Sequence, residues 1–253
     1  MFRLLILLLS LTLLPFAAFA EAPIAFAEED LTGVYTWPEG SSEEEATYIY
    51  RYSYPQIAGD DHLAQTINNV FQYEVSDAIG FECQMTGSDH PAELGQMLVT
   101  IGYEITHLSD QCLSVRINKT VTTGDNTTQI VKAFTFALTG PDAGTVTSLP
   151  YLLGVLKQGE TDEWLIERQT AKVDSCAREM VWALIEQDMK QPGSPIYGDL
   201  TLEEFEWGFY PEEDFYLDEE GNFVFFVQEG IIAPFDAGQF FYTITLEELQ
   251  DEI

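Results

Sequence analysis

The sequence predicts an α+β protein, with one or more antiparallel sheets and two long helices packed on one face. Three observations support this class: several segments alternate apolar and polar residues, two long segments have helical spacing, and no internal repeat or long linker divides the chain. Hydrophobic residues make up 46% of the 253 residues and aromatic residues 13%, which favours a β-rich core. We expect one α+β domain over residues 46–253.

The first twenty residues, MFRLLILLLSLTLLPFAAFA, are typical of a secretory signal peptide. Arg3 precedes an apolar run, and Ala18-Phe19-Ala20 forms a small-x-small cleavage site. A second such site at residues 25–27 leaves the mature end open. An uncleaved anchor is the alternative, although the apolar run is short for a span. We therefore expect a periplasmic or secreted protein without a stable membrane span after cleavage, beginning with an acidic lead-in over residues 21–45.

The first predicted strand covers residues 48–54, where a tyrosine occupies every second position until Pro55 ends the segment. A helix is expected over residues 62–83, because its apolar residues fall on one stripe. A loop containing Gly, Ser, Asp and Pro follows, through residue 93.

Three further strands are predicted over residues 98–105, 112–118 and 130–138. The sequences HLSDQ and TTGDNT form the turns between them. Apolar residues alternate with polar ones along the first two, so we expect an antiparallel meander with one dry face.

A short helical turn is expected over residues 149–156, and a second long helix over residues 162–190, ended by Pro192-Gly193. The last third of the chain is again β. Its predicted strands are 215–217 and 223–227, which form a hairpin, and 240–244. Gly221 supplies the positive φ that the hairpin turn requires.

The chain has three cysteines, and an exported protein meets an oxidising compartment. One disulfide with one remaining thiol is the simplest arrangement. Two helices on the same sheet face would bring Cys83 and Cys176 together. Cys112, on the polar face of its strand, would then be free. Three unpaired cysteines are the alternative.

Acidic residues dominate the charge: 43 Asp and Glu stand against 10 Lys and Arg, a formal net charge of −33. Such a field repels nucleic acids and anionic lipids, and it attracts metal ions, polyamines or basic proteins. Simple solubility of an exported protein is the alternative explanation for the acidity.

Catalytic and cofactor motifs are not evident. His62, His90 and His107 are isolated, so neither a catalytic triad nor a transition-metal site is expected. Paired carboxylates such as Glu203 and Glu213 are compatible with hydrolysis of glycosides, but acidic pairs are common in this chain. We expect a protein that is not an enzyme and that has no cofactor or metal. A cell-wall hydrolase using two carboxylates is the alternative, as is an envelope structural domain without a discrete ligand.

The C-terminal third resembles the RsiV-type family, also called DUF3298. The resemblance lies in the hairpin DFYLDEEGNFVFF, residues 214–226, and in IIAPFDAG, residues 231–238. Looser matches are YPQI at residues 54–57 and FTF at residues 134–136. The resemblance implies an exported α+β domain, which binds lysozyme in anti-sigma factors of this type and is an accessory domain in some cell-wall deacetylases. The family's GGAH motif is replaced here by TTGDNT, and no sigma-binding segment is present, so an anti-sigma role does not carry over.

The candidate binding residues come from two segments near the predicted hairpin: Glu212, Glu213, Asp214, Ile232, Pro234 and Phe235. By family analogy, the acidic residues would attract a cationic, lysozyme-like protein. The segment QEGIIAPFDAGQ, residues 228–239, is apolar and interrupted by proline between two aromatic runs. It is interpreted as a structural crossing whose apolar residues lie under the final strand, and a binding loop is the alternative.

Overall fold

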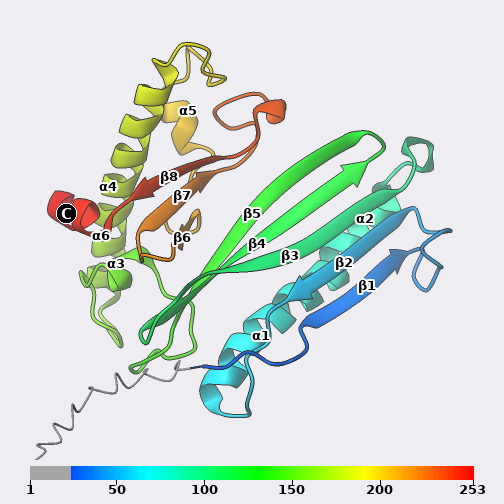
Figure 1. Cartoon of the computed structure of the whole chain (residues 1–253), viewed down its shortest axis with the longest axis horizontal. Coiled ribbons are helices and arrows are strands. Elements are labelled where there is room, and N and C mark those ends of the chain that lie inside the picture. The colour runs from blue at the N-terminus through cyan, green and yellow to red at the C-terminus, as the bar shows by residue number, and fades with distance from the viewer. Residues whose placement is uncertain (1–23) are drawn as a thin grey trace, which may run out of the picture.

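The structure is a computed structural model that describes residues 24–253, so the predicted signal peptide lies outside the described residues. The α+β class is confirmed: a five-stranded mixed sheet lies beside a three-stranded antiparallel sheet (Figure 1). The strands are β1 (Leu31–Trp37), β2 (Tyr48–Tyr54), β3 (Met97–Leu108), β4 (Cys112–Thr123), β5 (Asn126–Ala137), β6 (Phe215–Leu217), β7 (Phe223–Val227) and β8 (Phe240–Ile244). The α-helices are α1 (His62–Asp77), α2 (Cys83–Asp89), α3 (Leu149–Leu152), α4 (Glu163–Met189), α5 (Leu202–Glu206) and α6 (Leu246–Glu252). A π-helical turn, η1 (Ala78–Glu82), joins α1 to α2, and two 3₁₀ turns are η2 (Ala92–Leu94) and η3 (Phe235–Ala237).

The larger sheet has the strand order β1-β2-β3-β4-β5, and the predicted meander of β3, β4 and β5 is confirmed. Strands β2 and β3 are parallel, because the helical segment α1–η1–α2 crosses between them. Strand β1 lies within the segment expected to be a loosely ordered lead-in. It pairs with β2 over its whole length, and its Tyr35 is buried.

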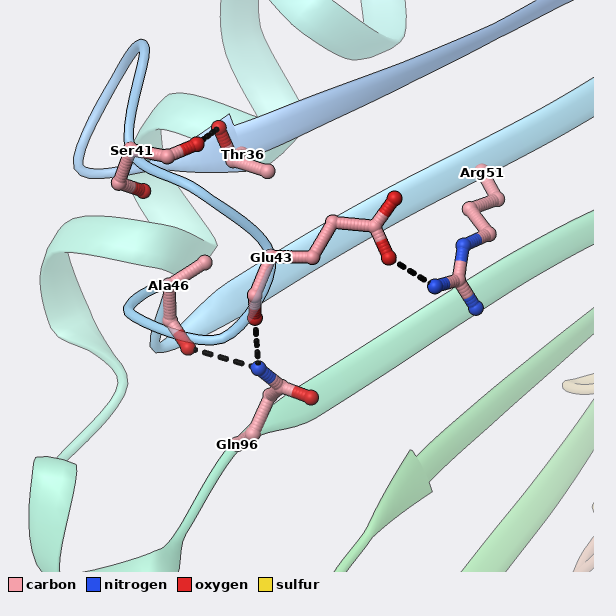
Figure 2. A network of polar contacts seen from close by, with 6 residues as sticks. All are labelled: Thr36, Ser41, Glu43, Ala46, Arg51 and Gln96. Carbon is pink, nitrogen blue, oxygen red and sulfur yellow. Dashed lines mark hydrogen bonds and ion pairs between the residues drawn. The ribbon is translucent and has the colours of Figure 1, made fainter.

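The connection between β1 and β2 is also fixed by polar contacts (Figure 2). Arg51 on β2 forms an ion pair with Glu43. The Gln96 Nε2 donates to the carbonyls of Glu43 and Ala46, at 2.7 and 2.9 Å. The Thr36 Oγ1 donates to the Ser41 carbonyl at 2.9 Å. The acidic run at residues 43–45 is therefore part of an anchored connection.

Helix α1 covers the larger sheet. It begins after Asp61, whose side chain accepts a hydrogen bond from the Ala64 amide at 2.9 Å and so caps the helix. Phe71, on the buried stripe of the helix, meets Phe134 and Phe136 of β5 edge-on, with ring centroids 5.9 and 5.6 Å apart. The core of this half lies between α1 and the sheet.

Helix α4 covers the smaller sheet. Asp162 caps its first turn, and a buried stripe follows: Val173, Ala177, Val181 and Ile185. These residues share a core with the aromatic residues of β6 and β7. The expectation that both long helices pack on one face is therefore wrong, because each covers its own sheet (Figure 1).

The predicted Cys83–Cys176 disulfide is not formed, and all three cysteines are free. Cys83 lies in the core of the larger sheet, where the Tyr48 hydroxyl is 3.5 Å from its sulfur. Cys176 lies on α4, in contact with Met180. The prediction required two helices on a common sheet face, and the structure separates them.

The face of β4 that carries its polar residues was expected to face solvent. At the end of the strand near Cys112, this face is covered by the smaller sheet. Cys112 is buried in the core of the smaller sheet, and the Ser114 Oγ accepts a hydrogen bond from the Leu217 amide of β6 at 3.1 Å. The Arg116 Nη1 donates to the Tyr216 hydroxyl at 3.1 Å. Both faces of this part of the meander are therefore covered, and polar side chains join the two sheets.

Candidate partner-binding surface

The structure separates the predicted binding residues into exposed and buried ones. Glu212, Glu213, Pro234 and Phe235 are exposed, whereas Asp214 and Ile232 are buried. Asp214 ends the loop before β6, where its carbonyl accepts from the Phe226 amide, and Ile232 belongs to the core of the smaller sheet. These two residues hold the segment in place and do not offer their side chains to a partner.

The β7–β8 loop, residues 228–239, has a structural role at the edge of the larger sheet. The Gln228 Oε1 accepts from the Val131 amide at 3.1 Å, and its Nε2 donates to the Val131 carbonyl at 2.6 Å. Glu229 and Gln239 bind the amide and the carbonyl of Gln129 in the same way. These side chains bind the backbone groups of β5 that a sixth strand would otherwise bind. They therefore protect the free edge of the sheet from pairing with another chain.

Four aromatic side chains are exposed on segments that surround this loop. Their exposed fractions are 77% for Trp207, 67% for Phe235, 49% for Tyr210 and 40% for Tyr197. Exposed aromatic residues that gather on one surface are typical of protein interfaces. Sequence reasoning found only Phe235, because Trp207 and Tyr210 follow a short helix and belong to no periodic pattern.

Backbone contacts hold these aromatic segments together. The Tyr197 amide donates to the Ile232 carbonyl at 3.0 Å, and the Tyr210 hydroxyl donates to the Trp207 carbonyl at 3.2 Å. A Cβ on Gly208 would come within 2.7 Å of the Ile231 side chain, so the segment carrying Trp207 packs directly on the β7–β8 loop. Helix α5 and this loop lie at the same end of the smaller sheet (Figure 1).

The charged side chains among these aromatic residues are all acidic. Glu206, Glu212, Glu213 and Asp236 are exposed and lie within three residues of an exposed aromatic residue. Beyond Lys190 the sequence contains no Lys, Arg or His. We call the exposed set the aromatic–acidic surface: Tyr197, Glu206, Trp207, Tyr210, Glu212, Glu213, Phe235 and Asp236. All of its residues lie in the part of the chain, residues 191–253, whose sequence contains no Lys, Arg or His.

Two carboxyl groups lie near this surface, one buried (Asp214) and one half-buried (Asp174). The Asp214 Oδ2 accepts a hydrogen bond from the Tyr210 amide at 2.7 Å. Burial, with a smaller effect of Glu213 and Glu212, raises the pKa of Asp214 to about 7. Burial also raises the pKa of Asp174 on α4, the nearby Glu212 carboxyl group adds to the effect, and Arg178 opposes it. Asp174 on α4 and Glu212 on the loop therefore lie close together, and their closeness favours the protonated form of Asp174.

The arrangement does not form a recognisable catalytic centre. Asp174, Glu212 and Asp214 line none of five cavities found within residues 24–253. Glu203 and Glu213, the pair considered for glycoside chemistry, are both exposed. Over the same residues, no group of three or more His, Cys, Asp or Glu side chains could hold a metal ion. None of the helices described is both long and apolar enough to cross a bilayer.

No protein-family model matches the chain, and no curated protein matches it either. Two of the solved structures that are similar to it are members of the DUF3298 family. A DUF3298 family member from Bacteroides fragilis has a TM-score of 0.47 and 14% identity, covering 89% of this chain and 92% of the other. A DUF3298 family protein from Pseudomonas aeruginosa has a TM-score of 0.45 and 12% identity, covering 90% and 93%. Both belong to the family that the C-terminal motifs resemble. TM-scores and sequence identities this low carry no argument about the activity or the partners of this chain.

Proposed function

We propose that the protein is an exported binding module whose aromatic–acidic surface takes a cationic, lysozyme-like protein. The observation that carries the proposal is the set of four exposed aromatic side chains among exposed carboxylates, in a part of the chain, residues 191–253, whose sequence contains no Lys, Arg or His. Large aromatic residues with a polar end are the side chains that most often dominate binding energy at protein interfaces.

The charge supports a basic partner. Since 43 acidic residues face only 10 basic ones, most carboxylates have no partner within the chain. Five ion pairs are found among the described residues. The basic residue of each pair is Lys190 or comes before it in the sequence, so none of the five involves a basic residue of the C-terminal segment 191–253. A cationic protein would be steered towards the C-terminal third, while the same field would repel nucleic acids and anionic membranes.

Export supports the same partner class, since the first twenty residues have the features of a secretory signal. We propose that the mature protein works outside the cytoplasm, where secreted basic proteins are met. The resemblance of residues 214–238 to a family with lysozyme-binding members makes lysozyme the first partner to test.

Trp207→Ala is expected to weaken binding to lysozyme about tenfold, because an exposed indole at the centre of an interface is a frequent energetic anchor. The measurement is calorimetric titration of lysozyme into the purified protein at low salt. Trp164→Ala is the matched control, since Trp164 on α4 is also exposed, by 64%, and lies outside the surface. It should leave the affinity unchanged.

The same titration tests the role of charge. Affinity should fall as the salt concentration rises past about 0.15 M, where the Debye length is about 8 Å. Undetectable binding at low salt by the folded protein would show that lysozyme is the wrong partner. Equal losses in the two tryptophan variants would show that this surface is the wrong one.

A further inference from the structure

A cavity of about 270 Å³ lies between α1–η1 and the larger sheet, and it shares no lining residue with the aromatic–acidic surface. Its floor is apolar and tyrosine-rich, and its rim is charged. The floor residues are Tyr50, Tyr54, Ile101 and Ile117, all buried, and the exposed Ile130 lies at the edge of the floor. The charged residues are Glu74, Asp77, Glu82, Lys119 and Lys132. The cavity is close to the lower size limit of small-molecule sites.

The two lysines at the rim are already neutralised by glutamates from the helical side. The Lys132 Nζ lies 2.7 and 2.8 Å from the two carboxylate oxygens of Glu74. Lys119 on β4 forms an ion pair with Glu82. An anionic ligand would have to displace a carboxylate from one of these pairs, against the field of a chain of net charge −33.

Asp77 is the carboxylate that remains. It is exposed at the rim, and its side chain takes part in none of the ion pairs or hydrogen bonds found for the described residues. The π-helical turn η1 follows it directly and carries Glu82 at its far end. Turns of this type widen a helix locally and occur often at functional sites. Here the turn lies along one side of the cavity.

The tyrosines on the floor can act as neutral hydrogen-bonding groups. Tyr50 and Tyr54 are almost fully buried. Burial raises the pKa of Tyr54 to about 12, so its hydroxyl stays protonated at neutral pH. The floor therefore offers ring faces, isoleucine methyl groups and neutral hydroxyls, which suit a short aliphatic chain.

We propose that this cavity binds a small primary amine, whose ammonium group pairs with Asp77 and whose aliphatic chain lies over the isoleucines of the floor. One carboxylate in excess over the lysines fits a ligand with one positive charge. Apart from the two lysine–glutamate pairs at the rim, the remaining lining residues are apolar or neutral, which fits a short alkyl chain better than a fully hydrated cation.

Hexylamine and hexanoate are matched probes, since they share a similar chain and carry opposite charges. The measurement is a titration of the full chain at low salt, followed by NMR of ¹³C-labelled isoleucine δ1 methyl groups. Hexylamine should give saturable shifts at Ile101, Ile117 and Ile130. Ile185 and Ile232, in the core of the smaller sheet, should not move. Hexanoate should give no saturable shift.

Asp77→Asn should weaken hexylamine binding about fivefold, the effect expected of a partly exposed ion pair. Asp251→Asn, at an exposed position on α6, removes the same charge far along the chain and should leave the affinity within about twofold. The proposal is overturned if hexanoate shifts the floor methyl groups as hexylamine does, or if hexylamine shifts none of them. It is also overturned if the two variants weaken binding equally, since the general field would then be responsible.

Discussion

Replacing Gln228 with alanine should lower the free energy of unfolding by about 2–4 kcal/mol, because it leaves the amide and carbonyl of buried Val131 without partners. Each unpaired buried backbone group costs about 1–3 kcal/mol. The measurement is urea unfolding of both proteins. We expect the slope of the unfolding free energy against urea concentration to be the same in the two, so that only the midpoint changes. Gln228→Glu is a useful second variant, because a carboxylate can accept from the Val131 amide but cannot donate to its carbonyl.

Gln239→Ala is the matched control. Gln239 donates to the carbonyl of the exposed Gln129 and, at a longer 3.4 Å, to the Gln228 Oε1, and its loss leaves both Val131 contacts of Gln228 in place, so water can replace what is lost. We expect a loss below about 1 kcal/mol. If the Gln228 and Gln239 variants lose the same stability, the loop does not protect the buried edge of β5 as described.

The stability of the protein should fall as pH rises from about 4 to about 7, and Asp214 should account for about 1–3 kcal/mol of the change. The pKa of Asp214 is raised to about 7 in the folded protein, chiefly by burial. The folded state therefore holds a proton that the unfolded chain has already released above pH 4. Stability from this group is complete below pH 4 and is lost as pH rises through 7.

Asp214→Asn removes this titration while its side-chain oxygen can still accept from the Tyr210 amide. Urea unfolding at pH 4.5 and pH 8 should therefore show a smaller difference in the variant than in the parent protein. The pKa of Asp174 is also raised, so part of the pH dependence should remain. Asp125→Asn, at an exposed turn, makes the same chemical change and should keep the full difference. A parent profile that is flat or rises between these pH values would contradict the assignment.

The strongly periodic elements were predictable from the sequence. The apolar stripes of α1 and α4 and the alternation in β3 and β4 identify these elements because one side of each is buried. Strand β1 was missed because acidic residues surround it and only Tyr35 within it is fully buried. Helices α5 and α6 were missed because they are short, although Thr201 with Glu204 and Thr245 with Glu248 form capping boxes that the spacing T-x-x-E signals.

Contacts between the two halves were not predictable from local pattern. Ser114 and Arg116 alternate with apolar residues on β4 and therefore indicated a solvent-facing side, yet both bind residues of β6. The same limit applies to the disulfide, because a helical stripe shows which residues are buried but not against which sheet. Cys83 and Cys176 are both on such stripes and lie in different cores.

The candidate surface was predictable only in part. The sequence pointed to the acidic run at residues 212–214 and to the segment at 232–235. In the structure, each of these segments has exposed residues and at least one buried residue, Asp214 in the first and Ile232 in the second. One feature of the sequence could have pointed to Trp207 and Tyr210, namely the glycine between them. Gly208 lies between them, and the structure shows that it allows close approach to Ile231. A glycine among large aromatic residues indicates close packing of the backbone, and that packing brings Trp207 beside the β7–β8 loop.

Hydrogen–deuterium exchange of the complex with lysozyme tests the central proposal most directly, because it locates the contact on the chain. Binding should slow exchange in residues 207–214 and 228–239, which carry Trp207, Tyr210 and Phe235 of the aromatic–acidic surface. Residues 97–123, in the larger sheet, should exchange as they do in the free protein. A complex that protects other segments and leaves 207–214 and 228–239 unchanged would contradict the proposed function.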